Sequence, residues 1–241
     1  MNILPLFTTV ISGAFTYSLL KQYQERRKIH QLLWSIAMLF YAVSALMEFL
    51  MNRDILGPSV LAFKVYYILS APLVGLLGAG VVYLLGSKKI ANAFTALMVI
   101  LSLALLVTGA TQPIDQAVLT EAFQGPLGMA FHDAVQAYPM SVRMYAIIIN
   151  IVGGLVLMGG ALYSFIRDRR RTYNLWIFTG ALAPMIGGSA LAFFHMPDLF
   201  FVFECMGTAL LYWGFILSDR FIKKREALVQ ESKDRHTANP N

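Results

Sequence analysis

Three ionisable side chains interrupt apolar stretches of this sequence, and they are the residues best placed to do chemistry. Glu48, Lys64 and Glu204 each fall a few residues from the same end of a hydrophobic run. At a rise of about 1.5 Å per residue, all three reach roughly 6–9 Å below one membrane surface. An unpaired charge there is costly, so two carboxylates and one ammonium at one depth favour a buried, ion-paired cluster.

Two other arrangements fit the same residues. The run that holds Lys64 is longer than a bilayer requires, so its ammonium could instead extend to the membrane surface. Glu48 or Glu204 could also face a water-filled cavity without any partner. The candidate ligand-binding set therefore contains these three residues together with two histidines at the same side, His132 and His195.

The histidine and cysteine patterns predict neither a catalytic site nor a metal centre. No histidine lies in the middle of an apolar run, which gives little support for haem ligation within a bundle. No H-E-x-x-H spacing occurs, so a zinc hydrolase is poorly supported. Methionines near His195 and Cys205 could ligate a soft metal, but packing explains methionine in an apolar chain better. We expect no enzymatic activity, metal or cofactor.

The elements that carry these residues are membrane helices. Of the 241 residues, 58% are apolar and 13% charged, about half the charged fraction of soluble domains. This composition excludes a soluble globule, a disordered chain and a disulfide scaffold. Seven stretches approach the roughly 20 residues that span a bilayer. They are 3–20, 31–50, 60–86, 90–110, 142–166, 173–194 and 198–218. We therefore predict an all-α, polytopic protein of the cell membrane, with a seven-helix domain over 1–220 and a short basic tail over 221–241.

The basic residues predict the orientation of these spans. Sixteen of the 19 lysines and arginines fall in the loops after spans one, three and five and in the segment that follows the last span. By the positive-inside rule, the N-terminus lies outside and the C-terminus in the cytoplasm. The net charge of +6 is therefore explained by topology and by contact with lipid headgroups, not by binding of nucleic acid.

Spans one to three and five to seven show weak internal similarity. Leu33-Trp34 and Leu175-Trp176 each follow a basic loop, and Ser44-Ala45-Leu46 matches Ser189-Ala190-Leu191. These matches predict two parallel three-helix repeats joined by span four. Apolar helices that follow basic loops can also look alike by chance, and that alternative stays open here. The long segment 111–141 is expected to hold a short helix over 126–137 that covers the outer mouth, or to be a flexible loop.

Several motifs resemble a known sensor module. Arg169-Arg170-Arg171, the run Gly180 to Gly188 around Pro184, and Trp34 with Glu48 are similar to the seven-helix membrane region of some histidine kinases and diguanylate cyclases. The resemblance implies sensing or binding and supplies no catalytic residues, and no enzymatic output domain follows in this sequence. Microbial rhodopsins fit less well, because the last span, over 198–218, lacks a lysine for retinal.

Three functions remain open from the sequence. The first is a receptor-like sensor that binds a small molecule, ion or partner from the outer side and relays to a separate cytoplasmic protein. The second is a small-molecule transporter whose two repeats rock around a central site. The third is an accessory subunit of a larger membrane complex, which needs no site of its own.

Overall fold

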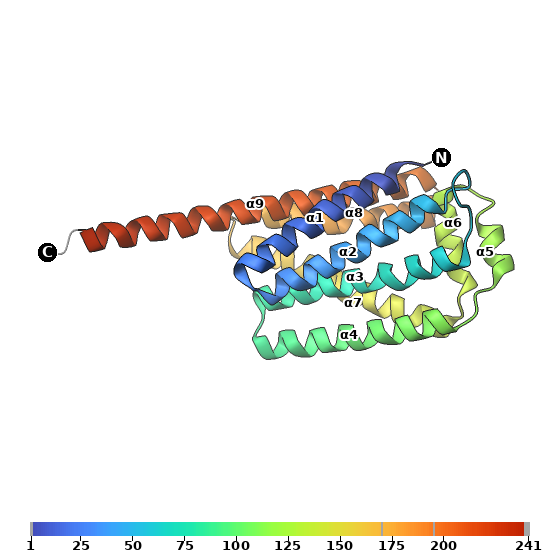
Figure 1. Cartoon of the computed structure of the whole chain (residues 1–241), viewed down its shortest axis with the longest axis horizontal. Helices are drawn as coiled ribbons and strands as arrows, with labels where there is room; N and C mark the ends of the chain where they lie inside the picture. Colours follow the sequence, from blue (N-terminus) through green and yellow to red (C-terminus); the bar gives the residue numbers. More distant parts are fainter. Residues whose placement is uncertain (1, 170, 195, 239–241) are drawn as a thin grey trace.

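The protein forms a long helical bundle, described here from a computed structural model (Figure 1). The structure describes the backbone over 2–169, 171–194 and 196–238, and side chains there except at 189–194, 197–198 and 225–238. The described residues fold into α-helices and one 3₁₀ turn, without strands. The elements are α1 (Leu4–Arg26), α2 (Ile29–Leu50), α3 (Val60–Leu85), α4 (Lys88–Thr111), α5 (Gln116–Ala122), α6 (Leu127–Ala134), η1 (Val135–Ala137), α7 (Met140–Arg167), α8 (Tyr173–Phe194) and α9 (Pro197–Ala238).

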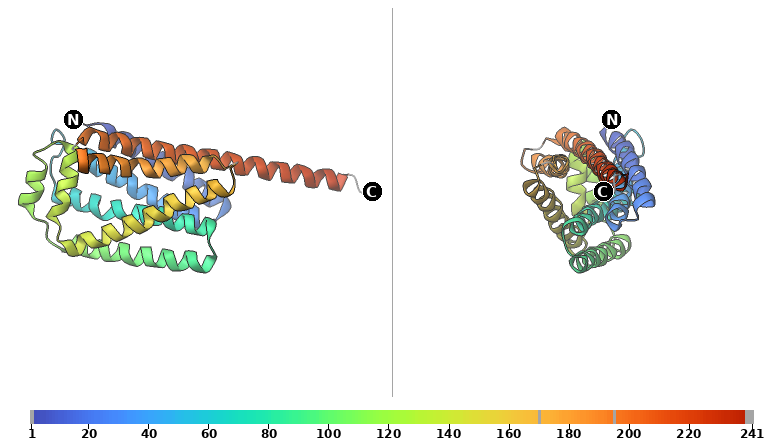
Figure 2. Two further views of the ribbon diagram at one scale, coloured as in Figure 1. Left: turned by 180° about the vertical axis from the view of Figure 1, so that it is seen from behind. Right: turned by 90° about the vertical axis from the view of Figure 1, so that its left-hand side faces the viewer.

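Six of the long helices close into a ring. Going around it, α1 packs on α2, α2 on α3, α3 on α7, α7 on α8, α8 on α9, and α9 on α1. The seventh long helix, α4, lies outside this ring against α3 and α7, as the end-on view shows (Figure 2). The long helices begin within a few residues of the seven spans predicted from the sequence.

The chain is a membrane protein by the length and hydropathy of its helices. Five helices are long and apolar enough to cross a bilayer: α2, α3, α4, α7 and the Leu199–Lys224 part of α9. The clearest case is α4, because large aliphatic side chains such as Ile100, Leu103 and Val107 are more than half exposed along it. Such a surface is stable only against lipid or another apolar partner. The remaining two long helices lie in the ring, α1 between α2 and α9, and α8 between α7 and α9.

Two ends of the bundle can be distinguished by what covers them. At one end, here called the capped end, α5, α6 and η1 lie across the tips of the long helices (Figure 1). At the other, here called the basic end, the α1–α2, α3–α4 and α7–α8 connections meet, and α9 leaves the bundle. The helix α9 has 42 residues and would measure about 63 Å. It passes position 220 without a break, so the predicted boundary between domain and tail lies inside a helix.

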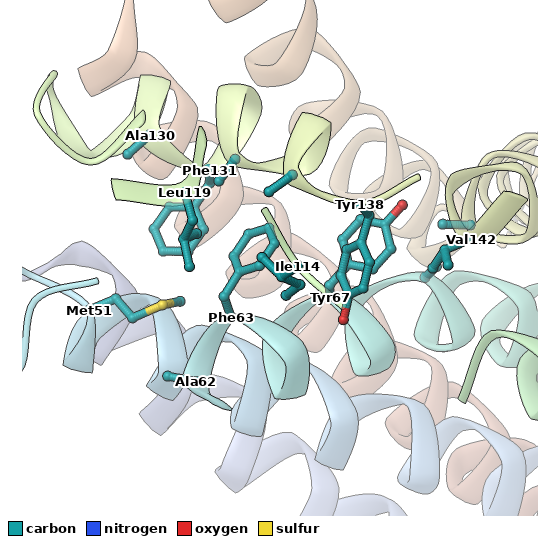
Figure 3. Packing of buried hydrophobic residues seen from close by; sticks show 14 of the residues in the cluster. Met51, Ala62, Phe63, Tyr67, Ile114, Leu119, Ala130, Phe131, Tyr138 and Val142 are labelled. Carbon is teal, nitrogen blue, oxygen red and sulfur yellow. The ribbon is translucent and has the colours of Figure 1, made fainter. Parts of the chain in front are cut away.

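The capped end is a packed aromatic layer and not an open loop. The ring of Tyr138, which follows η1, is stacked with Phe63 and tilted against Tyr67 of α3 (Figure 3). Phe131 of α6 meets Phe123 edge to face. The Tyr138 hydroxyl donates a 2.8 Å hydrogen bond to the Gly109 carbonyl at the end of α4. Burial raises the pKa of Tyr138, so this hydroxyl stays protonated and remains a donor. The segment 111–141 is therefore a cap held by side chains.

Candidate functional site

The two carboxyl groups of the predicted cluster lie close together inside the bundle. Glu48 stands near the end of α2 and Glu204 in the second turn of α9, with only 2% and 6% of each residue exposed. The two carboxyl groups are close enough to interact with each other, and both line the same cavity. The Tyr66 hydroxyl is the neighbour of Glu48 on one side, and the Tyr41 hydroxyl is the neighbour of Glu204 on the other. The site thus joins three helices that are distant in sequence.

The carboxyl pair has no cationic partner among the described residues. Neither Glu48 nor Glu204 takes part in a salt bridge there. The Oε2 atom of each is buried and accepts no hydrogen bond from a donor in the described part of the chain. Two carboxylates are acceptors only and repel each other, so their contact requires a shared proton or a cation between them. The described residues supply the two acids and no cation to pair with them.

The pair lines a cavity of about 540 Å³ between α2, α3, α7, α8 and α9. This volume is within the range of small-molecule sites, which are mostly apolar with a few polar groups. The polar wall is made by Tyr41, Ser44, Glu48, Tyr66, Ser70, Asn150 and Glu204. The apolar wall is aliphatic and includes Leu73, Leu77, Leu157, Met158 and Leu211. The arrangement therefore offers an acidic end and an aliphatic body.

The cavity opens sideways between α7 and α8. Three of its lining residues are also exposed on the outside of the bundle: Ile151 and Leu155 of α7, and Met185 of α8. Their exposed fractions are 57%, 63% and 49%, and all three lie near the middle of their helices. In a bilayer crossed by these helices, a mouth at that height, rimmed by apolar side chains, would face the hydrocarbon.

Aromatic rings lie between the carboxyl pair and the capped end. Tyr66 and Phe200 line the cavity. The Tyr66 ring contacts the cap directly, and Phe200 is linked to it through Phe201 of α9. The Tyr66 ring lies 4.8 Å from that of Phe131, and Phe200 meets Phe201 at 5.1 Å. Because Phe201 is only 1% exposed and packs edge to face on Phe131, the cap and the cavity share a wall.

The structure places Lys64 apart from the carboxylates, which excludes the ion-paired cluster among the arrangements that the sequence left open. Its ammonium does not join the carboxylates, because it donates hydrogen bonds of 2.8 and 2.9 Å to the carbonyls of Ala110 and Gln112. These carbonyls end α4, where a helix leaves acceptors unpaired and where a positive charge is favourable. Lys64 therefore caps a helix at the capped end, and the predicted three-member cluster is reduced to the two glutamates.

The two histidines of the predicted set do not strengthen the site. His132 lies on α6 with its side chain exposed, outside the cavity. His195 lies outside the described residues. Within the described residues, no group of three or more histidine, cysteine, aspartate or glutamate side chains could hold a metal ion.

Sequence reasoning missed the polar residues that surround the glutamates. Tyr41, Ser44 and Glu48 follow the spacing i, i+3, i+7, which places them on one face of α2. Tyr66 and Ser70 do the same on α3 at a spacing of four. Polar residues at helical spacing on two otherwise apolar helices indicate that these two helix faces line a common cavity, and this pattern could have been found in the sequence.

A second cavity, of about 630 Å³, lies at the basic end and is lined by Arg26, Lys28 and Arg171 among others. Much of its polar wall is paired within the protein. Arg26 forms a 3.2 Å salt bridge with Asp219, and the amide of Asn174 donates to the Ser164 hydroxyl at 2.9 Å. The cavity around Glu48 and Glu204 is the stronger candidate, because both carboxyl groups are buried and the Oε2 atom of each has no hydrogen-bond partner among the described residues.

Comparison with known proteins gave no lead. No protein-family model, no curated protein and no solved structure matches the chain.

Proposed function

We propose that this protein is a receptor-like membrane sensor whose small-molecule site is the cavity around Glu48 and Glu204. One observation carries the proposal. The helix that bears Glu204 in the cavity, α9, is the same helix that continues out of the bundle to Ala238. A ligand that contacts this carboxyl acts directly on the only element among the described residues that extends beyond the basic end (Figure 1). A separate cytoplasmic protein would read the movement of α9.

The packing of α9 supports a movement of α8 and α9 as one unit. A Cβ added to Gly207 would stand 2.7 Å from the Gly180 carbonyl oxygen, so the backbones of α8 and α9 are in contact. The interface between α9 and α1 is smaller than that between α9 and α8. It includes the Ser18–Tyr212 hydrogen bond and the Arg26–Asp219 salt bridge. In the proposed mechanism, α8 and α9 shift together relative to α1 and α2 when the cavity fills.

The membrane arrangement expected from the sequence belongs to this proposal. We propose seven spans, with the capped end outside and the basic end in the cytoplasm. The connections at the basic end carry the arginines and lysines that direct this orientation. A cysteine at Asp115, in a Cys205→Ser background, should react with an impermeant reagent on intact cells, and one at Lys89 only after permeabilisation. The reverse pattern would contradict the orientation.

A transporter is the second candidate, and the ring order favours it. The interfaces α3–α7 and α9–α1 occupy equivalent places if α1–α3 and α7–α9 are repeats. Two such halves could rock around the cavity between them. Uptake of a permanently charged quaternary ammonium probe into proteoliposomes, above that of protein-free vesicles, would favour transport. The accessory-subunit proposal ranks last, because a subunit needs neither the cavity nor the carboxyl pair.

A distance measurement tests the sensor proposal. Spin labels at Lys89→Cys and Lys224→Cys, in a Cys205→Ser background, report the position of α9 relative to α4 at the basic end. Both sites are exposed. The protein is placed in lipid nanodiscs and saturated with a small amphipathic probe, either phenylbutylamine or phenylbutanol. Binding of either probe in the cavity should shift the distance between the labels by about 2 Å.

The matched control pairs Lys89→Cys with Arg167→Cys at the end of α7. Because α7 packs against both α3 and α4, this distance should not change when the probe binds. A probe that binds, by radioligand measurement, yet leaves the Lys89–Lys224 distance unchanged would contradict the relay through α9.

A further inference from the structure

We infer that the cavity binds an amphipathic organic cation, with an ammonium group between Glu48 and Glu204 and an aliphatic or aromatic body along the apolar wall. The inference rests on the proposed function only for the location of the site. It adds the chemical class of the ligand and the route by which it enters.

The acidic end of the cavity calls for a cationic donor. Each Oε2 atom of the pair is buried and has no donor among the described residues, and both residues line the cavity. An ammonium group offers several N–H donors and a positive charge, so it can bond to both carboxyl groups at once. The rings of Tyr41, Tyr66 and Phe200 in the same wall would add cation–π attraction.

The remainder of the cavity calls for an apolar body. The wall away from the acids is formed mainly by leucines, with Val74 and Met158. The mouth of the cavity opens between α7 and α8, where exposed apolar residues lie. In a bilayer this mouth would face the lipid hydrocarbon. An amphipathic amine partitions into a bilayer in its neutral form, so it could enter by this side and take up a proton from the carboxyl pair.

Other ligand classes fit the same walls less well. A hard metal cation needs about six or more oxygen ligands, and aliphatic side chains form most of this cavity. An anionic amphiphile would be repelled by the acids. A neutral apolar molecule would fill the volume but would leave both Oε2 atoms without a donor, at the cost of a buried unsatisfied polar group.

Three probes with one body and different heads separate these classes. Phenylbutylamine, phenylbutanol and 5-phenylvalerate share a phenylbutyl chain and carry a cationic, neutral or anionic head. Binding of tritiated phenylbutylamine is measured on protein in nanodiscs, with empty nanodiscs subtracted, and the other two compete. The amine should bind about tenfold or more tightly than the alcohol, and the carboxylate should not compete.

Substitutions identify the site. Glu204→Gln and Glu48→Gln should each weaken amine binding about tenfold while affecting alcohol binding little, because the amide removes the charge and keeps the shape. The matched control is Glu121→Gln on α5, where the side chain is exposed and outside the cavity. It should leave binding of both probes unchanged.

A steric variant keeps the test decisive if a glutamine variant does not fold. Gly154 lines the cavity, and a Cβ added there meets only Val74 Cγ1 at 3.8 Å. Gly154→Leu should therefore fold and exclude both amine and alcohol. Its control is Gly159→Leu on the same helix, where a Cβ meets nothing within 4 Å and binding should persist.

The outcomes distinguish this inference from the proposed function. Equal affinity for amine and alcohol, with the distance shift of α9 retained, would overturn the cationic ligand and leave the sensor. Selective amine binding without a shift of α9 would overturn the sensor and leave the ligand class. Failure of both probes to bind at millimolar concentration, or binding that Gly154→Leu does not affect, would overturn the cavity as a site.

Discussion

Two adjacent glycines show how differently the two sides of α7 are built. A Cβ added to Gly153 would stand 2.8 Å from the backbone of Gly75 on α3, whereas one added to Gly154 would meet only a side-chain methyl at 3.8 Å. On the first side, α3 and α7 are in backbone contact. On the second side, the helix borders the cavity that opens toward α8.

This difference indicates which parts of the bundle can move. Backbone contact through glycine leaves no room for adjustment, so α3 and α7 form a fixed frame with α4 against them. The α7–α8 seam holds a cavity and exposed aliphatic side chains, so α8 and α9 can shift at a smaller cost. The buried carboxyl pair joins a helix that can shift to one that packs on the frame, because Glu204 belongs to α9 and Glu48 to α2, which lies against α3.

The largest expected effect comes from filling the tight side. Gly153→Leu forces its side chain into the backbone of α3 and should destabilise the protein by about 3 kcal/mol or more, since overpacking cannot relax against backbone atoms. Thermal unfolding followed by size-exclusion chromatography in detergent measures the loss. Gly159→Leu is the control, and equal stability of the two variants would show that the α3–α7 contact is not tight.

A smaller effect is expected at the capped end. Tyr138→Phe removes the hydroxyl that donates to the Gly109 carbonyl and leaves that buried acceptor without its partner. The expected loss is about 1–3 kcal/mol in the free energy of unfolding. The removed hydroxyl lies in the cap, so phenylbutylamine affinity should stay within twofold. A larger change in affinity would mean that the cap belongs to the moving part and not to the frame.

The smallest effect is expected for Lys64→Met. The methionine keeps the length of the side chain and removes the charge that caps α4, which should cost up to about 1 kcal/mol. Amine binding should be unchanged, because the Lys64 ammonium contacts carbonyls and not the glutamates. A large loss of stability that Glu48→Gln recovers would instead restore the ion-paired cluster predicted from the sequence.

Much of the fold could be read from the sequence. Span predictions such as 60–86 and 173–194 nearly coincide with α3 and α8, because twenty or so apolar residues have few other stable forms. The first span was placed at 3–20, yet α1 lies outside the helices apolar enough to cross a bilayer by composition. Threonine, serine and glutamine lower its hydropathy, and several of them face the interior of the bundle.

The candidate site was only partly predictable, and the reason is geometric. Counting residues from a helix end gives depth in the membrane, and Glu48, Lys64 and Glu204 do lie toward the same end of the bundle. Depth does not give rotation about the helix axis, nor which helices are neighbours. The glutamates point into one cavity, and Lys64 points to the end of α4 instead.

The sequence by itself determined the class of this protein, its helices and its buried acids, because hydropathy and charge act locally along the chain. Tertiary structure alone decided that α2 and α9 bring two carboxyl groups together with no cationic side chain paired to them in the part of the chain that the structure describes. It also decided that segment 111–141 closes one end as an aromatic cap. Both depend on which helix faces are in contact. Helices come into contact where small residues allow close approach, as at Gly153 with Gly75 and at Gly207 with Gly180, and a single position in the sequence does not identify its partner.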